Sequence, residues 1–172
     1  IDVFTGLGAA VNALPGGEIV PAMDRGLLDA AEFNNASSDK LLGFADVSKV
    51  CMLQSYHQNA EQFEIMFNKT KYDALPEKMR AIIANAVEAA SADMSWKAVD
   101  RYSKDYAELQ TVNNVKFYKT PDAVLQTQLT AYDAAAAKKS TDNALFKEIE
   151  ASQKAFAARA VKWDLDTNVN RR

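Results

Sequence analysis

The sequence holds very little cysteine and histidine: each occurs once among its 172 residues. A single cysteine, Cys51, excludes an intrachain disulfide, and its place in the apolar run from Val47 to Leu53 favours a small hydrophobic residue of the core. A zinc site would need more histidine or cysteine ligands. Neither a Cys–His nor a Ser–His arrangement is indicated, so the sequence gives no reason to expect an enzyme.

Long hydrophobic runs and an excess of positive charge are also missing. No run of 18 or more apolar residues occurs, so no membrane span is predicted. The 20 Lys and Arg residues are interspersed with 23 Asp and Glu residues, which leaves a net charge of -3 and no basic face for nucleic acid. With 48% hydrophobic and 25% charged residues, the composition is that of a soluble globular protein with a sizeable core.

The stretch from Glu18 to Ser38 carries the strongest local signal. It predicts a short amphipathic helix over 18–25 that stops at Gly26, and then a buried strand over 27–33. Polar residues, from Glu32 to Asn35, follow at the end of this strand. Because α/β folds place ligand-binding groups at strand ends, this tip is predicted to be half of a small-molecule site.

Periodicity and capping residues predict the remaining elements. Alternating apolar residues predict strands over 50–54 and 62–68, joined by a polar loop at 56–61, and a further short strand over 115–118. Helices are predicted over 2–13, as one or two short turns within 41–50, from Pro76 to about Gln110, over 122–138 and over 142–163. The predicted helix caps are Asp2, Thr120-Pro121-Asp122 and Ser140-Thr141-Asp142.

These elements predict a helix-rich α/β fold in two parts. Residues 1–68 form an α/β part with a small sheet, and residues 69–172 form a helical part. The first part has too few strands for a self-sufficient sheet, while the long helices of the second carry apolar stripes that need a partner. The chain also begins at Ile1 without an initiator methionine or signal peptide. Together these features favour a truncated chain that lacks half of its fold.

Three blocks of the sequence resemble the DctP family of solute receptors of TRAP (tripartite ATP-independent periplasmic) transporters. They are LPGGEIVPAMDRGLLDAAEF at 14–33, FADVSKVCMLQSYHQNAEQFEIMFNK at 44–69 and KYDALPEKMRAII at 71–83. The branch that the chain is most similar to binds 2-oxo acids and related small carboxylates together with a cation. Since family members are about twice as long, the resemblance implies the second lobe and C-terminal helical part of a two-lobed fold like that of periplasmic binding proteins.

The resemblance also implies site residues. Glu32 matches the acid whose carboxylate ligates the cation, which would be Na⁺ or Ca²⁺ because hard cations take oxygen ligands. Phe33 matches a position where this branch often has tryptophan, whose carbonyl joins the metal while its ring walls the pocket. Phenylalanine keeps the carbonyl and an apolar face but loses the indole donor. The arginine that pairs with the substrate carboxylate lies, in the family, just upstream of the position of Ile1.

The local sequence leaves alternatives open at these positions. Glu32 fits a solvated or salt-bridged glutamate as well as a cation ligand. Asn34, like its neighbour Asn35, fits a satisfied turn as well as a substrate contact. His57, with Gln58 beside it, fits either a donor to a substrate carboxylate or an ordinary histidine of a surface loop.

Two classes of function follow. The first is a non-enzymatic receptor in the periplasm that captures a small organic carboxylate with a cation, closes two lobes over it and docks on the membrane subunits of the transporter. The alternative is a helical dimerisation or interaction module with no ligand of its own, in which the helices from residue 76 onward pack on another chain. Some members of the branch exchange the C-terminal helix between protomers, so a homodimer is compatible with both classes.

Overall fold

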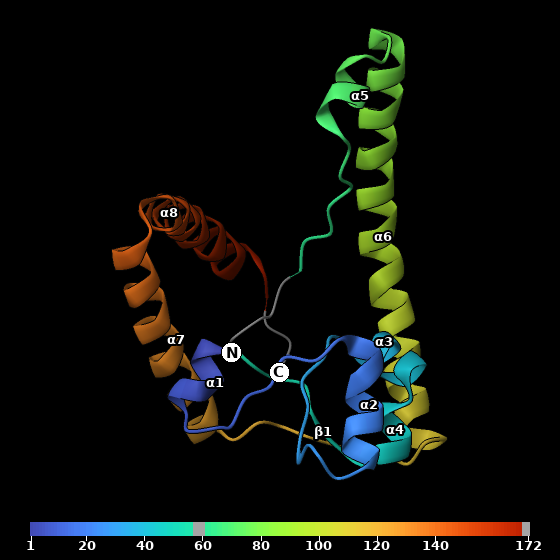
Figure 1. The fold of residues 1–172 in the computed structure, drawn as a ribbon, viewed down its shortest axis with the longest axis vertical. Helices are drawn as coiled ribbons and strands as arrows, with labels where there is room; N and C mark the ends of the chain where they lie inside the picture. Colours follow the sequence, from blue (N-terminus) through green and yellow to red (C-terminus); the bar gives the residue numbers. More distant parts are fainter. Residues whose placement is uncertain (57–60, 170–172) are drawn as a thin grey trace. The chain divides into compact units, whose positions relative to one another are not determined.

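The computed structural model describes residues 1–56 and 61–169, and Figure 1 shows its elements. The described chain forms two packing units whose segments alternate along the sequence. The central unit contains residues 13–54 and 61–120, and the terminal unit contains residues 1–12, 55–56 and 121–169. The predicted division into residues 1–68 and 69–172 rests on composition rather than on packing, and it stays a prediction.

The central unit is built on a long helix and a small sheet. Its helices are α2 (Gly16–Asp24), α3 (Ala36–Leu42), α4 (Phe44–Val47), α5 (Lys69–Asp73) and α6 (Glu77–Thr111). Strands β1 (Val50–Met52) and β2 (Lys116–Tyr118) pair in parallel, with Cys51 opposite Phe117. The two strands confirm the predictions over 50–54 and 115–118, and α6 confirms the predicted long helix.

The core of the central unit lies where α3, α4 and the C-terminal part of α6 meet the sheet. Its buried apolar residues are Ala36, Ala45, Leu109 and Val115, against which Cys51, Tyr106 and Phe117 pack. The Tyr106 and Phe117 rings meet edge to face, with their centroids 4.6 Å apart, which is a favourable geometry for two aromatic rings. Cys51 is half-buried here, in agreement with the apolar surroundings that it has in the sequence.

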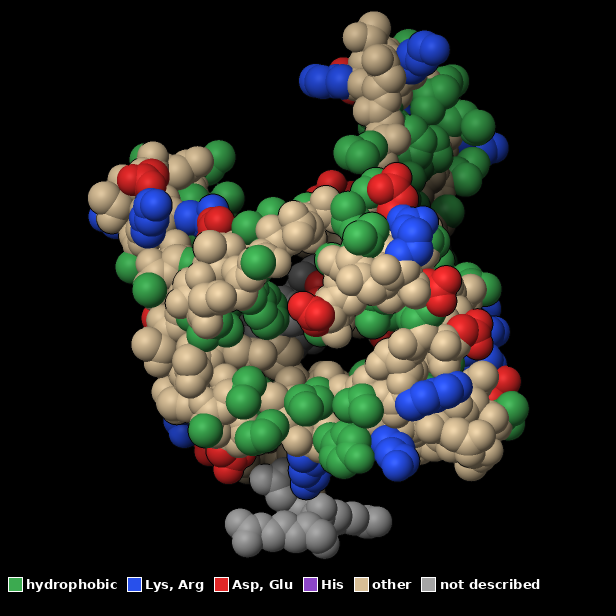
Figure 2. Space-filling model, turned by 60° about the horizontal axis from the view of Figure 1, so that its bottom comes forward, with side chains coloured by type: hydrophobic (Ala, Val, Ile, Leu, Met, Phe, Trp, Pro, Cys, Tyr) green, Lys and Arg blue, Asp and Glu red, His purple; other side chains and the backbone are tan. Residues whose placement is uncertain are grey.

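The N-terminal part of α6 is open, whereas its C-terminal part is packed. The buried residues of this helix are Asp105 and Leu109, both near its end. Upstream, Ile82 is 52% and Trp96 81% exposed, and Figure 2 shows hydrophobic side chains at the surface of the part that α5 and the start of α6 form. The predicted apolar stripe is therefore present, and Met79, Ile82 and Met94 are its large members that lie exposed in the N-terminal part.

The terminal unit is helical, with α1 (Asp2–Gly6), α7 (Asp122–Asp142) and α8 (Ala144–Thr167). α1 packs on α7, where Lys139 Nζ lies 2.7 Å from Asp2 Oδ2. α8 packs on α7 as well, and there the Ser140 hydroxyl donates to the Glu150 carboxylate. Every residue of α8 is described and none of them is buried, and several large apolar side chains, including Phe156 (62%) and Trp163 (71%), are mostly exposed.

Two predicted strands are not present in the described residues, and these predictions are wrong. Residues 27–35 form an irregular connection between α2 and α3, in which Leu27 is 69% exposed. Residues 61–68 form no regular element, and Phe63 and Met66 are 61% and 85% exposed. Apolar alternation indicates only which face of a segment is hydrophobic. A strand also needs a neighbour for its backbone N–H and C=O groups, and the sheet joins β1 to β2.

The helix predicted over 2–13 is too long. α1 stops at Gly6, because glycine is a poor helix former and Gly8 has a left-handed φ of 87°. Asp2 lies in the first turn of α1 rather than at its N-cap, which is Ile1.

The N-cap of α7 is Pro121, within the predicted Thr120-Pro121-Asp122, whereas the cap predicted at Ser140 to Asp142 is wrong. Ser140 to Asp142 continue α7, and Asn143 caps α8 by accepting the Phe146 N–H. The Thr120 hydroxyl does not cap α7, because it donates to the Gln54 carbonyl oxygen at 2.7 Å.

The described residues thus form a helix-rich α/β fold with a small parallel sheet. Within residues 1–56 and 61–169, no helix combines the length and the apolar character that a bilayer span requires. The predicted site residues from Glu32 to Asn34 lie in the connection between α2 and α3 rather than at the end of a strand.

Candidate functional site

The connection over residues 27–35, here called the α2–α3 loop, begins at a glycine stop. Gly26 follows α2 with a left-handed φ of 69°. Its N–H donates to the Met23 carbonyl at 2.9 Å, and the Leu27 N–H donates to the Ala22 carbonyl at 2.9 Å. This pair of bonds is a Schellman motif. The predicted glycine stop is confirmed, and α2 ends there because glycine takes this backbone angle at no steric cost.

Asn35 fixes the other end of the loop as the N-cap of α3. Its Oδ1 accepts from the backbone N–H groups of Ser37 (3.1 Å) and Ser38 (3.0 Å), which satisfies two donors that the start of a helix leaves open. Its Nδ2 donates to Asn34 Oδ1 (2.7 Å) and to the Tyr102 hydroxyl of α6 (3.2 Å). Asn35 therefore acts as a turn residue, and it also ties the loop to α6.

Phe33 packs its ring into the central unit. The ring stacks on that of Phe44 in α4, with centroids 5.9 Å apart. It also lies over the start of α2, where a β-carbon at Gly16 would be 2.8 Å from Phe33 Cε2. The ring thus anchors the α2–α3 loop on α2 and α4. The roles predicted for its carbonyl at a cation and for its ring in a pocket stay predictions.

A second carboxylate, Asp39 of α3, lies near Glu32. Glu32 and Asn34 are exposed. The Asp39 carboxylate accepts from the Asn34 backbone N–H, while its Oδ1 atom is buried with no hydrogen-bond partner in the part of the chain that the structure describes. Burial raises the pKa of Asp39 to about 6, and the negative charge of Glu32 adds to this rise. Glu32 of the loop and Asp39 of α3 therefore bring two acids to a place where a cation would be favourable.

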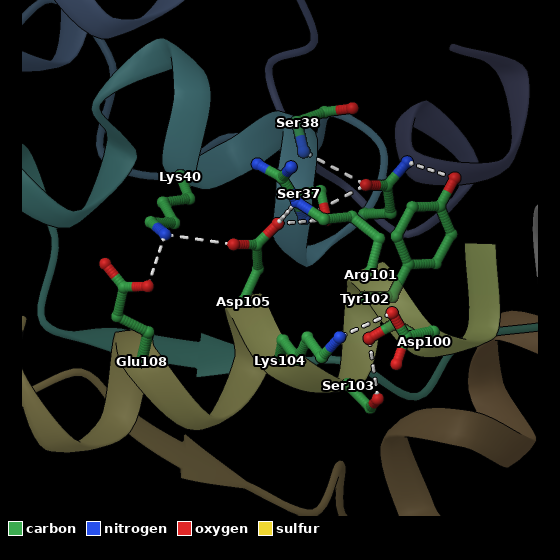
Figure 3. A network of polar contacts seen from close by, with 11 residues as sticks. Ser37, Ser38, Lys40, Asp100, Arg101, Tyr102, Ser103, Lys104, Asp105 and Glu108 are labelled. Atoms are coloured by element: carbon green, nitrogen blue, oxygen red, sulfur yellow. Dashed lines mark hydrogen bonds and ion pairs between the residues drawn. The ribbon is translucent and has the colours of Figure 1, made fainter. Parts of the chain in front are cut away.

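A polar network centred on Asp105 joins α3 to α6 next to the loop (Figure 3). Asp105 is only 4% exposed and accepts from the Ser37 hydroxyl at 2.6 Å and from Lys40 Nζ at 2.9 Å, both on α3. It also accepts from Arg101 Nε, one turn earlier on α6, at 2.5 Å. The hydrogen bond from Ser37, followed by those from Arg101 and Lys40, holds the pKa of Asp105 well below its usual range.

Sequence reasoning missed this network. Arg101 and Asp105 stand four residues apart, which in the sequence is the pattern of an ordinary ion pair on a helix surface. The partner on α3 cannot be found from a local pattern, because Ser37 and Asp105 are 68 residues apart in the chain. The only signal is a polar residue within the helical stripe of α6.

The structure does not place all predicted site residues. His57 and Gln58 lie outside the described residues. Within residues 1–56 and 61–169, no three His, Cys, Asp or Glu side chains are grouped so that they could hold a metal ion. A cation at Glu32 would therefore need further ligands such as backbone carbonyl oxygens or water.

Comparison with protein families and curated proteins matches nearly the whole chain. Residues 1–144 match the model of DctP, described as bacterial extracellular solute-binding protein, family 7. A monocarboxylate 2-oxoacid-binding periplasmic protein of Nostoc sp. is 26% identical over 167 residues, which are 95% of this chain and 44% of that protein.

Solved structures share the fold. A TRAP periplasmic solute binding protein from Colwellia psychrerythraea, with bound calcium and pyruvate, has a TM-score of 0.80 at 24% identity over 96% of this chain and 53% of that chain. One from Pseudoalteromonas atlantica T6c, with bound sodium and pyruvate, has a TM-score of 0.79 at 23% identity over 97% of this chain and 53% of that chain. The chain therefore spans about half the length of these proteins, and its predicted fold class is confirmed.

Proposed function

Because this chain belongs to family 7 of the bacterial extracellular solute-binding proteins, the DctP family, we propose that it is the C-terminal half of a TRAP solute receptor that binds a small 2-oxo acid. The proposal is supported by the share of this chain, and of each related protein, that the matches cover. At least 95% of the chain matches about half of proteins that are described as binding a 2-oxo acid or that were solved with pyruvate. In this role the chain binds its solute without chemical change.

The proposed contacts to the acid come from polar side chains of this half. Asn34, His57 and Gln58 would donate hydrogen bonds to the substrate, and Phe33 would lie beside it. Asn34 is supported by its exposed position next to Glu32. The arginine that the resemblance implies for the carboxylate would come from upstream of Ile1, so both halves would contribute to one site.

Glu32 and the Phe33 carbonyl would hold the cation, which would be Na⁺ or Ca²⁺. Their oxygen atoms fit this role, because hard cations take carboxylate and carbonyl ligands. Asp39 supports it from the structure, since its raised pKa reflects both burial and the charge of Glu32. A bound cation would offset the repulsion between these acids, and it would let a negatively charged substrate lie beside an acidic loop.

An N-terminal lobe is the proposed cover of the segment over residues 61–68 and of the open part of α6. The alternating apolar residues of the segment, Phe63, Ile65 and Phe67, are 61%, 61% and 49% exposed. A lobe that offers a sheet edge would let this segment add as a strand, which pairs its backbone groups as well as covering its side chains. Closure of the two lobes would then bury the ligand.

A second copy of the chain is the proposed cover of α8. Phe156, Trp163 and Leu165 on this helix are 62%, 71% and 67% exposed, and an open apolar surface of this kind marks an interaction site. Light scattering of the wild type and of Trp163→Lys tests the homodimer. We expect a dimer that the substitution weakens, and a monomeric wild type at high concentration would remove the proposal.

The receptor would act in the periplasm and deliver the acid to the membrane subunits of a TRAP transporter. The descriptions of the Nostoc, Colwellia and Pseudoalteromonas proteins as periplasmic support this location. The closed form, which a bound ligand would favour, would be the form that these subunits bind.

Thermal unfolding of the full-length receptor that carries this chain tests the proposed function. Pyruvate with Ca²⁺ or Na⁺ should raise the unfolding midpoint by several degrees, because a ligand at about 100 times its Kd adds roughly 2.7 kcal/mol to the free energy of unfolding. Pyruvamide, which lacks the carboxylate, is the matched ligand control and should leave the midpoint unchanged. If no carboxylate raises the midpoint with either cation, the receptor proposal fails.

Glu32→Gln, with Asp29→Asn as its control, tests the cation role. Both substitutions remove one negative charge from an exposed position of the α2–α3 loop. Glu32→Gln should abolish the cation dependence of pyruvate binding, whereas Asp29→Asn should keep it. Intact cation dependence in Glu32→Gln would show that this glutamate is no ligand.

A further inference from the structure

We propose that Asp105 on α6 is a positioning residue for ligand binding, because it holds the start of α3 and thereby the loop residues from Glu32 to Asn34. The proposal rests on the proposed function and adds to its site a residue from a distant part of the chain. Asp105 does not touch the loop itself, so its action would pass through Ser37 and Asn35.

Two contacts from α6, one turn apart, hold the N-terminal turn of α3. The Tyr102 hydroxyl accepts from Asn35 Nδ2 at 3.2 Å, and Asp105 Oδ2 accepts from the Ser37 hydroxyl at 2.6 Å. Asn35 directly follows Asn34 and binds its side-chain oxygen at 2.7 Å. A shift of this turn would therefore move Asn34 and the residues before it.

The carboxylate of Asp105 holds α3 at two points. Ser37 donates to Oδ2 at the start of the helix, and Lys40 donates to Oδ1 at 2.9 Å almost one turn later. Two fixed points determine the direction of a helix axis. They matter here because α3 has 7 residues, and a helix of this length has little stability of its own.

The surroundings of Asp105 indicate that it orients α3 more than it stabilises it. The buried apolar residues of α3 and of the end of α6 are Ala36 and Leu109. The Asp105 side chain is only 5% exposed and pairs with Lys40, whose side chain is 26% exposed. A charge pair of this kind adds little net stability after desolvation, and in this proposal its role is to select one arrangement of α3 on α6.

Because α6 is continuous, it connects Asp105 with the surface that the other lobe is proposed to contact. The helix runs without a break from Glu77 to Thr111. Its C-terminal part holds the α2–α3 loop through Asp105, and its open N-terminal part is the proposed contact of the other lobe. Asp105 and that contact therefore lie on one continuous helix, so a lobe that grips α6 would also affect the position of α3 and, through it, of Glu32 and Asn34.

Asp100 provides a matched control on the same helix. Its carboxylate pairs with Lys104 at 2.7 Å in the same i, i+4 spacing that joins Arg101 to Asp105. The side chains of Asp100 and Lys104 are 67% and 71% exposed, and Figure 3 shows the pair away from α3. Asp100→Asn therefore removes an acid from α6 without affecting the hold on α3.

Hydrogen exchange of the ligand-free, full-length protein tests whether Asp105 fixes the N-terminal turn of α3. Asp105→Asn should speed exchange of the Ser37, Ser38 and Asp39 amides by roughly tenfold, because exchange reports local opening. Asp100→Asn should leave these rates unchanged. Ser37→Ala is the second variant, since it removes one donor and keeps every charge, and it should raise the same rates by a smaller factor.

Titration calorimetry with pyruvate and Ca²⁺, performed well below the unfolding midpoint, tests the effect on binding. Asp105→Asn should raise the Kd by about tenfold or more, which is the loss typical of removing a residue that supports a ligand group. Asp100→Asn should keep the wild-type Kd. A residue that served only the stability of the fold would lower the midpoint and leave the Kd of the folded molecules unchanged.

Each outcome decides a part of the proposal. Unchanged exchange in both Asp105→Asn and Ser37→Ala overturns it, because Asp105 then does not hold the loop. Faster exchange with an unchanged Kd overturns the role in binding. If the wild type binds no carboxylate, the proposed function fails and the binding role of Asp105 fails with it, whereas the exchange rates still decide whether Asp105 holds the start of α3.

Discussion

The two ends of α6 place one helix in opposite environments. Around Asp105 and Leu109 the helix is buried against α3, α4 and the sheet, whereas Met79 and Ile82 near the other end are exposed. Both ends carry apolar residues at helical spacing. An apolar stripe therefore makes it favourable to bury a helix face, but the face is buried only where another segment packs on it.

Leu109→Ala should show the contrast most strongly. Leu109 is 4% exposed in the core, so the truncation leaves a cavity and should lower the free energy of unfolding by about 2–4 kcal/mol. Ile82→Ala is the matched substitution at the open end, where the side chain is 52% exposed, and it should cost less than about 1 kcal/mol. Urea unfolding of both variants measures the two losses of unfolding free energy. Equal losses would contradict the difference between the packed and the open part of α6.

Asp39→Asn should stabilise the packed end at neutral pH. The pKa of Asp39 in the folded chain, about 6, lies above the value of 3.8 expected without the fold. The folded state therefore binds this proton more tightly, and stability is lost as the pH rises from about 4 to 6. Because solvent still reaches part of the group, the gain at pH 7 should be about 1 kcal/mol. Urea unfolding between pH 4 and 7 should show a flatter profile in the variant.

Asp105 provides the control for this pH series, because the fold lowers its pKa whereas it raises the pKa of Asp39. Its pKa is lowered by the Ser37, Arg101 and Lys40 hydrogen bonds, so its stabilisation is present above the usual range of an aspartate and is lost as the pH falls below that range. Asp105→Asn should flatten the acid side of the profile and leave the slope between pH 4 and 6 in place. A variant of Asp39 that flattens only the acid side would contradict the assignment.

Gly16→Ala should destabilise the chain by about 1 kcal/mol relative to Gly17→Ala, since overpacking a filled site is unfavourable. A β-carbon at Gly16 would meet Phe33 Cε2 at 2.8 Å, whereas nothing lies within 4 Å of one at Gly17. Both substitutions favour helix formation in α2 alike, so their difference isolates the contact with Phe33. Thermal unfolding measures it, and equal midpoints would show that the ring moves aside freely.

Met66→Lys should have the smallest effect on the chain itself. Met66 is 85% exposed, and surface substitutions of this kind change the free energy of unfolding by less than about 0.5 kcal/mol. In the full-length receptor the same change should destabilise, because the proposed lobe would cover this segment. Met66→Leu keeps an apolar side chain and should be tolerated in both. Equal tolerance of Lys in both proteins would show that no lobe covers Met66.

Most helices were predictable because their signals are local. The stripe of α6 and the glycine stop after α2 depend on residues that are close in the sequence. The same reasoning failed for residues 27–33 and 62–68, where apolar side chains predict strands that have no partner strand in the described sheet. It also failed at Ser140, because the choice between neighbouring polar residues as a cap depends on where the next helix begins.

For the candidate site, too, some features were predicted from the sequence and others came only from the structure. Glu32 and Phe33 were predicted as site residues because they stand in a block that resembles a family, and Asn34 because it is a polar residue after a predicted strand. Their placement before α3 rather than at a strand end came from the structure. Asp39 was missed although it is only a few residues away. Its importance comes from burial, and burial is not visible in a short polar sequence.

The local sequence was sufficient to predict the long helices α6, α7 and α8, the stop of α2 and the family that the chain resembles. These properties depend on backbone preferences and on neighbours within a few residues. Only the tertiary structure decided that Asp105 faces Ser37 and Lys40, that Phe33 lies over Gly16, and that one end of α6 is buried while the other is open. The physical reason is that burial and pairing arise between segments far apart in the chain, and no local pattern records which segments meet.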